Sequence, residues 1–132
     1  MWLTKDLRSV SDSGHASKVF SDILSSSASS DRHKHSPGAA FVSFDIDAIS
    51  GSDCPGVSCP ATVGLTAHEA LQICEIAGRN PIVKLMDLSE FNPQIEAYRT
   101  GRLMANMFYF FAMGVARRKL DAATRSSGAS SA

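Results

Sequence analysis

Apolar residues along the chain gather in a few segments separated by polar or turn-forming stretches. Residues 39–47, AAFVSFDID, are rich in β-forming residues without clean alternation, which predicts a strand covered on both faces. Residues 82–88 predict a second strand, ended by the Asn92-Pro93 pair. A long apolar run, residues 103–116, lies in a helix predicted from about Tyr98 to Lys119.

A helix is predicted between the two strands. Thr66 and Glu69 have the spacing of a capping box, and Gly78 is placed to end the helix in a left-handed conformation. Apolar residues at helical spacing predict a buried stripe. Its members are Ala70, Leu71, Ile73, Cys74 and Ala77. A strand, a helix and a strand in this order predict a right-handed parallel crossover, and therefore an α/β fold.

The 132 residues suffice for one domain, in which we distinguish three regions. Residues 1–38 form an N-terminal segment whose serine-rich part predicts a flexible insert, with a short amphipathic helix around ASKVFSDIL as a minor element. Residues 39–119 form the main part. Residues 120–132 predict a disordered tail.

Composition and charge exclude several classes of protein. Thirteen basic and thirteen acidic residues give no net charge, so nucleic acid is not an expected partner. The apolar run at 103–116 is shorter than the roughly 20 residues that span a bilayer, so no membrane partner is expected. The first residues have no apolar core of a secretory signal, and the three cysteines lack a paired spacing. We therefore expect a cytoplasmic protein with reduced thiols.

Two aspartates at the end of the first predicted strand are the main candidates for chemistry. In a strand, Asp45 and Asp47 would project to the same side, at the carboxyl edge where parallel α/β sheets hold their sites. Two neighbouring carboxylates favour a divalent metal between them. Glu90 follows the second strand and is expected at the same edge. A capping role for Asp45, a solvated Asp47 and a solvated Glu90 are the alternatives.

The histidines predict no metal site. His33 and His35 lie in the serine-rich segment, His15 has similar neighbours, and His68 falls in the first turn of a helix. None of these histidines has apolar neighbours in the sequence that would pack around it and hold it in position as a metal ligand.

The motif SFDIDAISGSDCPGVSCPATVGLT, with DLSEFNP downstream, resembles the ureohydrolase family, which includes arginase, agmatinase and formimidoylglutamase. The resemblance runs from about Ala40 to Lys119. PGVSCP, SEFNP and YRTGRL are most similar to the formimidoylglutamase branch. The resemblance implies part of a three-layer α/β/α arginase-like fold with a parallel sheet, incomplete in its N-terminal half.

The resemblance also implies roles for particular residues. Asp45 and Asp47 would be ligands of a binuclear Mn²⁺ centre, and Asp47 would have a catalytic role in orienting or deprotonating the attacking water. Glu90 and Thr66 would bind the substrate, a small-molecule amidine. In the formimidoylglutamase branch, N-formimidoyl-L-glutamate is hydrolysed to glutamate and formamide during histidine degradation.

The chain also departs from the family pattern. Family members are about twice as long, and their Gly-Gly-x-His and Asp-x-His-x-Asp segments do not occur in these 132 residues. We therefore expect a fragment of a formimidoylglutamase-like hydrolase that has little activity alone. The alternatives are an agmatinase-type or arginase-type hydrolase, a non-catalytic subunit that docks on a full-length homologue, and an unrelated Mg²⁺-dependent transferase that uses the Asp-x-Asp pair. Homo-oligomerisation stays open.

Overall fold

The computed structural model describes residues 15–29 and 38–128. Their regular elements, in chain order, are helix α2 (His15–Ser29), strand β1 (Ala40–Asp45), the 3₁₀ helix η1 (Ile46–Ala48), helix α3 (Ala67–Arg79), strand β2 (Val83–Ser89) and helix α4 (Tyr98–Gly128).

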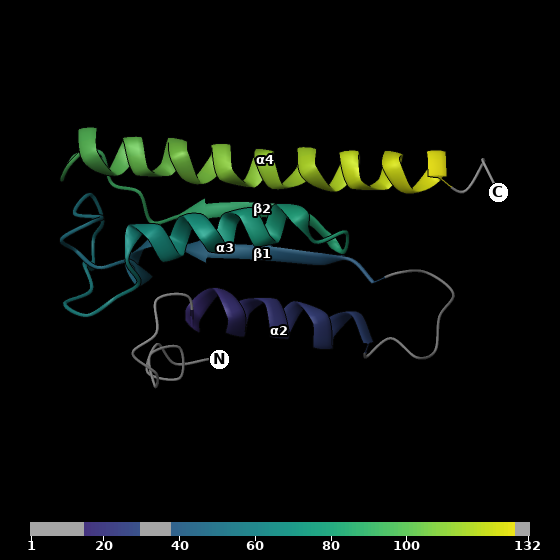
Figure 1. Ribbon diagram of the computed structural model, residues 1–132. Coiled ribbons are helices and arrows are strands. Elements are labelled where there is room, and N and C mark those ends of the chain that lie inside the picture. The colour runs from purple at the N-terminus through teal and green to yellow at the C-terminus, as the bar shows by residue number, and fades with distance from the viewer. Residues whose placement is uncertain (1–14, 30–37, 129–132) are drawn as a thin grey trace.

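Strands β1 and β2 form a parallel pair, as the strand, helix, strand order predicted. Their register places Phe41 opposite Leu85 and Asp45 opposite Ser89. Helices α2, α3 and α4 lie on one face of this pair, with α3 between the other two (Figure 1). Both strands end at the side of the molecule where the loop from η1 to α3 lies (Figure 1). The described residues therefore form an α/β unit of two layers.

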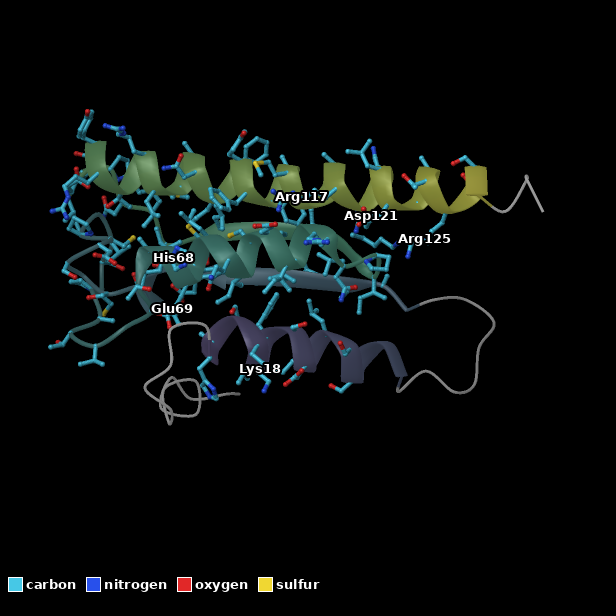
Figure 2. The ribbon with its side chains drawn as sticks, viewed as in Figure 1. Lys18, His68, Glu69, Arg117, Asp121 and Arg125 are labelled. Atoms are coloured by element: carbon cyan, nitrogen blue, oxygen red, sulfur yellow. The ribbon has the colours of Figure 1, made fainter. Side chains whose placement is uncertain are left out.

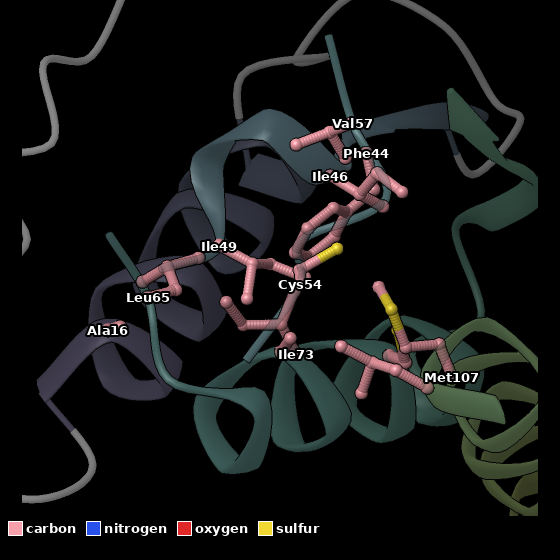
Figure 3. Packing of buried hydrophobic residues seen from close by; sticks show 12 residues of the cluster. Ala16, Phe44, Ile46, Ile49, Cys54, Val57, Leu65, Ile73 and Met107 are labelled. Atoms are coloured by element: carbon pink, nitrogen blue, oxygen red, sulfur yellow. The ribbon is translucent and has the colours of Figure 1, made fainter. Parts of the chain in front are cut away.

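The core lies between the sheet and the three helices (Figure 3). Ile46, Ile49 and Cys54, just beyond β1, are fully buried beside Phe44 of the strand. Met107 of α4 is also fully buried in this cluster. Burial of apolar side chains on both sides of the turn after β1 fixes the backbone that carries Asp45 and Asp47.

The other face of the strand pair is bare. Phe41 and Leu85 are 57% and 61% exposed, and they lie opposite each other across the two strands. The Ser43 hydroxyl on the same face donates to the Asp87 carboxylate over 2.9 Å. The expectation that β1 is covered on both faces is therefore wrong for the described residues, because these supply only one helical layer.

The sequence predicted the start of α3 correctly and its end incorrectly. Thr66 and Glu69 form the complete capping box. The helix ends at Arg79 with Asn80 as its cap, so Gly78 lies inside it and does not adopt a left-handed conformation. Gly78 is instead needed for the close approach of α4: a Cβ there would meet the backbone of Phe111.

Two helices are longer than predicted. Helix α2 spans fifteen residues because Ala16 and Leu24 are buried against the rest of the core, and such packing outweighs the low helix propensity of serine. Helix α4 continues to Gly128, past the boundary predicted at Lys119. Asp121 contributes to this extension through an ion pair with Arg79 at 3.8 Å. The rest of the serine-rich insert and the last four residues lie outside the described ranges.

Helix α4 contains the long apolar run of residues 103–116. Neither it nor any other helix within the described ranges is long and apolar enough to cross a bilayer.

Candidate functional site

Asp45 and Asp47 lie where the chain leaves β1. The strand ends at Asp45, and Ile46 to Ala48 form the 3₁₀ helix η1. Asp45 caps this helix, since its Oδ1 accepts a hydrogen bond of 2.9 Å from the backbone N–H of Asp47. Asp47 therefore lies in η1 and not in the strand, so the prediction that strand alternation makes Asp45 and Asp47 project to the same side is wrong. The alternative that Asp45 caps a backbone amide is therefore correct. The other carboxylate oxygen of Asp45 takes no part in this hydrogen bond.

Asp47 has a buried oxygen without a partner. Its Oδ1 accepts no hydrogen bond, although the great majority of buried side-chain polar atoms in proteins have one. The alternative that Asp47 is solvated is therefore wrong for this oxygen, which is buried from solvent. An unpaired, buried carboxylate oxygen two residues from an exposed carboxylate is suited to a cation, which would satisfy it.

Glu90 lies at the same edge of the sheet. It directly follows Ser89, the register partner of Asp45. Its φ of 73° is in the left-handed region, which is costly for a residue with a side chain and is often found at functional sites. Its carboxylate also accepts a hydrogen bond of 3.4 Å from the Ser58 hydroxyl.

The loop after η1 holds the Glu90 turn in place. Val57 pairs with Phe91 in an antiparallel bridge, and Asn92 donates its backbone N–H to the Gly56 carbonyl over 2.8 Å. The segment that follows the two aspartates is therefore joined by backbone bonds to the segment that follows β2. This pairing fixes the backbone position of Glu90 relative to the Asp-x-Asp turn.

A buried polar network anchors this loop to α4. The Thr100 hydroxyl, fully buried, accepts from the Gly56 N–H over 2.7 Å and donates to the Glu96 carboxylate over 2.9 Å. Backbone N–H groups of Arg99 and Thr100 donate to the same carboxylate, and these bonds lower the pKa of Glu96. Glu96 thus stays ionised and caps the start of α4.

We expect Thr100→Val to destabilise the fold by about 1 to 3 kcal/mol, because it leaves the buried Gly56 N–H without an acceptor. Urea unfolding followed by circular dichroism measures this loss. Thr100→Ser keeps the hydroxyl and is the matched control. Equal stability of the valine and serine variants would show that the network does not hold the loop.

Thr66 lies beside the Asp-x-Asp turn. The preceding residue, Leu65, donates its backbone N–H to the Ala48 carbonyl over 2.8 Å. The Thr66 hydroxyl is engaged in the capping box, donating to Glu69 Oε2 over 2.8 Å and accepting from the Glu69 N–H. The substrate-binding role assigned to Thr66 stays a prediction.

The cysteines and histidines of the described residues do not join the two aspartates in a group of metal ligands. Cys54, Cys59 and Cys74 are all free thiols. Burial raises the pKa of Cys54, and the neighbouring Asp47 carboxylate adds to this effect. His68 is exposed at the start of α3 (Figure 2), while His33 and His35 lie outside the described residues. No three His, Cys, Asp or Glu side chains come together within residues 15–29 and 38–128.

The sequence matches the arginase family over residues 13–114. The chain belongs to the arginase family. This membership confirms the resemblance stated from the SFDID and SEFNP motifs. It also removes the basis for an unrelated transferase built on the Asp-x-Asp pair.

Curated relatives within the arginase family include formimidoylglutamases. The Aromatoleum aromaticum protein is 35% identical over 82 residues, covering 61% of this chain and 24% of the relative. The Staphylococcus aureus protein is 31% identical over 98 residues, covering 74% of this chain and 30% of the relative. The chain thus spans less than a third of the length of either.

Solved structures agree with the α/β fold. Trypanosoma cruzi formiminoglutamase, crystallised with Mn²⁺, superimposes with a TM-score of 0.61 and 52% identity, covering 61% of this chain and 27% of that one. Entamoeba histolytica arginase, in complex with L-ornithine, gives a TM-score of 0.68 at 20% identity, over 82% of this chain and 33% of that one. The second likeness shows the fold alone. The described residues are therefore part of an arginase fold.

The Asp-x-Asp turn offers oxygen ligands of the kind that a manganese ion would take. The unpaired Asp47 oxygen and the adjacent Asp45 carboxylate are hard oxygen donors, which suit Mn²⁺. Two metal ions need several more carboxylate and imidazole ligands, and the part of the chain that the structure describes does not bring them together. Two carboxylates alone are too few ligands for tight metal binding.

Sequence reasoning missed the residues that position this site. Thr100, Gly56 and Ser58 carried no signal, because each acts through a partner more than thirty positions away. Glu96 could have been found, since an acidic residue just before a helix is a common capping signal. Asp53 was also missed. Its carboxylate accepts from the Ala67 N–H over 2.8 Å and helps to cap α3.

Proposed function

We propose that this chain carries one half of the active site of a manganese-dependent, formimidoylglutamase-like hydrolase. The observation that carries the proposal is the buried, unpaired Oδ1 of Asp47, next to Asp45 and at the same sheet edge as Glu90. Family membership and the formimidoylglutamase relatives support the reaction class. The proposed substrate is N-formimidoyl-L-glutamate, hydrolysed to glutamate and formamide in histidine degradation. A cytoplasmic location is part of the same proposal.

Asp45 and Asp47 would hold the metal ions, and Glu90 would hold the substrate. Manganese, when bound, supplies a water with a lowered pKa as the nucleophile. The Asp47 carboxylate would orient this water and accept its proton. A formimidoyl group carries N–H donors and a positive charge when protonated, which the Glu90 carboxylate would bind and orient. Ser58 and the Val57–Phe91 bridge keep that carboxylate in place.

The proposed activity needs residues beyond those that the structure describes. The chain covers 24% and 30% of two formimidoylglutamase relatives, so most of a complete relative has no counterpart here. The remaining metal ligands would come from that part, either in the same protein or in a second chain. We therefore propose that these 132 residues alone hydrolyse little or no substrate.

Calorimetric titration of the chain with Mn²⁺ tests the half-site. We expect weak binding that Asp47→Asn and Asp45→Asn each reduce by at least about tenfold, because each removes a ligand charge. Asp87→Asn is the matched control, since Asp87 is an exposed carboxylate on the bare sheet face and should leave the affinity unchanged.

Equal Mn²⁺ affinity in all three variants would contradict the proposed ligands. Assays with N-formimidoyl-L-glutamate, agmatine and arginine then test the reaction. Rapid hydrolysis of any of these substrates by the purified chain would contradict the proposal that its active site is incomplete. Turnover of agmatine or arginine alone would favour the agmatinase or arginase alternative over formimidoylglutamase.

A second candidate is a non-catalytic subunit that docks on a full-length homologue. The bare sheet face favours it, because Phe41 and Leu85 leave an apolar area uncovered. Co-purification with a full-length formimidoylglutamase, weakened by Phe41→Ser, would support this candidate. Unchanged co-purification of the serine variant would exclude the sheet face as the contact.

A further inference from the structure

The turn that follows the Asp-x-Asp pair is held by two helices. Residues 51–53 form this turn, in which the Asp53 N–H donates to the Ser50 carbonyl over 2.9 Å. The loop that contains it lies at the end of the molecule where α3 and α4 both begin (Figure 1). Two consecutive residues of the turn, Ser52 and Asp53, bond to different helices. The turn is therefore fixed relative to both α3 and α4.

Helix α4 holds Ser52 through the side chain of Arg99. The Arg99 Nη2 donates to the Ser52 carbonyl over 2.6 Å, across 47 positions of the sequence. The backbone of Arg99 is itself fixed, because its N–H donates to the Glu96 carboxylate over 2.7 Å. Hydrogen bonds from a charged donor are stronger than those between neutral groups. Arg99 therefore makes a specific contact with the loop, although its side chain lies at the surface.

Helix α3 holds the next residue, Asp53. The Asp53 Oδ2 accepts a hydrogen bond of 2.8 Å from the backbone N–H of Ala67, the first residue of α3. A carboxylate is favoured at this end of a helix by the helix dipole. The bonds to Ser52 and Asp53 thus connect the first turn of α4 to the first turn of α3 through two adjacent residues of the loop.

Backbone bonds connect this turn to Asp47. Ser50, whose carbonyl accepts from the turn, donates its own N–H to the Leu65 carbonyl over 2.8 Å. Leu65 in return donates its N–H to the Ala48 carbonyl over 2.8 Å. Ala48 ends η1 and directly follows Asp47. A shift of residues 51–53 would therefore be passed to η1 by backbone contacts.

We propose that Arg99 is a positioning residue that holds η1, and with it the Asp47 carboxylate, in the geometry that metal binding requires. The part of this inference that concerns metal rests on the proposed function, whereas the part that concerns the position of the turn does not. Metal–ligand distances in protein sites vary by only about 0.2 Å. A loosened turn would thus weaken metal binding even with both carboxylates of the Asp-x-Asp pair present.

Arg102 offers a matched control for Arg99. It lies three residues further along α4 and lines the same hollow between α3 and α4. Its guanidinium is engaged within α4, donating to the Tyr98 hydroxyl over 3.0 Å with the Tyr98 ring centre 5.4 Å away. Both arginines are exposed, so Arg99→Gln and Arg102→Gln remove the same charge from the same surface. A difference between these two variants therefore reports the bond to Ser52.

Amide hydrogen exchange followed by NMR tests whether Arg99 holds the turn. In Arg99→Gln, the protection of the Asp53 and Asp47 amides should fall about fivefold, the effect of losing one hydrogen bond of ordinary strength. Amides in the middle of α3 should keep their protection. Arg99→Lys retains a charged donor and should restore most of the lost protection, and Arg102→Gln should exchange like wild type.

Titration of the same variants with Mn²⁺ tests the consequence for metal. Arg99→Gln should weaken the affinity about tenfold, as is usual for residues that orient metal ligands, whereas Arg102→Gln should leave it unchanged.

Unchanged exchange in Arg99→Gln would overturn the proposal, and so would faster exchange with unchanged Mn²⁺ affinity. An equal loss of protection throughout α3 would show a purely structural role for Arg99. A wild-type chain that binds no Mn²⁺ would contradict the proposed function instead, and the exchange rates would still decide whether Arg99 holds the turn.

Discussion

Replacing Gly78 by leucine is expected to destabilise the fold more than any other single substitution considered for this chain. A Cβ at this position would meet the Phe111 carbonyl oxygen and would lie 3.0 Å from the Val115 nitrogen, so α3 and α4 would have to move apart. The contact is reciprocal, because a Cβ at Gly114 would lie 2.9 Å from the Arg79 nitrogen. Overpacking against side chains costs about 1 to 3 kcal/mol, and backbone cannot yield as side chains do.

The expected loss exceeds about 3 kcal/mol, a large part of the roughly 5 to 15 kcal/mol that stabilises a domain. Urea unfolding followed by far-UV circular dichroism measures it. Gly101→Ala is the matched control in α4. A Cβ there meets only the Phe91 ring at 3.6 Å, so alanine should stabilise the helix by about 0.8 to 1 kcal/mol. A well-folded Gly78→Leu variant would contradict the close crossing of α3 and α4.

Raising the pH above 9 is expected to destabilise the chain through Cys74. Burial raises the pKa of this thiol from 9.0 to about 12. Between these values the unfolded chain has lost a proton that the folded chain still holds, so stability falls as the pH rises. From pH 8 to pH 10.5 the expected loss from Cys74 is about 2 kcal/mol. Below pH 8 the thiol is neutral in both states and contributes no pH dependence.

Cys74→Ala removes this contribution and is the control. The difference in unfolding free energy between wild type and Cys74→Ala should therefore change with pH in this window. A smaller slope should remain in the variant, because burial also raises the pKa of Cys54. Identical pH profiles of wild type and Cys74→Ala would mean that solvent reaches the Cys74 thiol in the folded chain.

The proposed half-site and the Cys54 contribution to the pH response share one cause, which is burial of the segment beyond the end of β1. The same packing that buries Cys54 also removes one Asp47 oxygen from water and leaves it without a hydrogen bond. Without metal, this unpaired oxygen should lower the free energy of unfolding by on the order of 1 to 3 kcal/mol, the usual penalty for an unsatisfied buried polar group. Metal binding would offset this cost, so the proposed site would lower the stability of the metal-free fold.

Local sequence signals predicted the elements that carry the site. The capping box of Thr66 and Glu69 marks the start of α3, and Tyr98 begins α4 as predicted. The order of strand, helix and strand predicted the parallel pair, and with it the shared edge of Asp45 and Glu90. These features depend on residues close together in the chain, where propensity, capping and periodicity act.

Tertiary contacts decided what each site residue can do. The sequence placed Asp45 and Asp47 at the end of a strand, but only the fold shows that Asp45 caps η1 and that Asp47 has an unpaired oxygen. Likewise, the left-handed backbone of Glu90 and the anchoring of Gly56 by Thr100 arise from segments that meet in space. Burial, unpaired polar atoms and close backbone approach depend on such distant contacts, so a local pattern of residues cannot specify them.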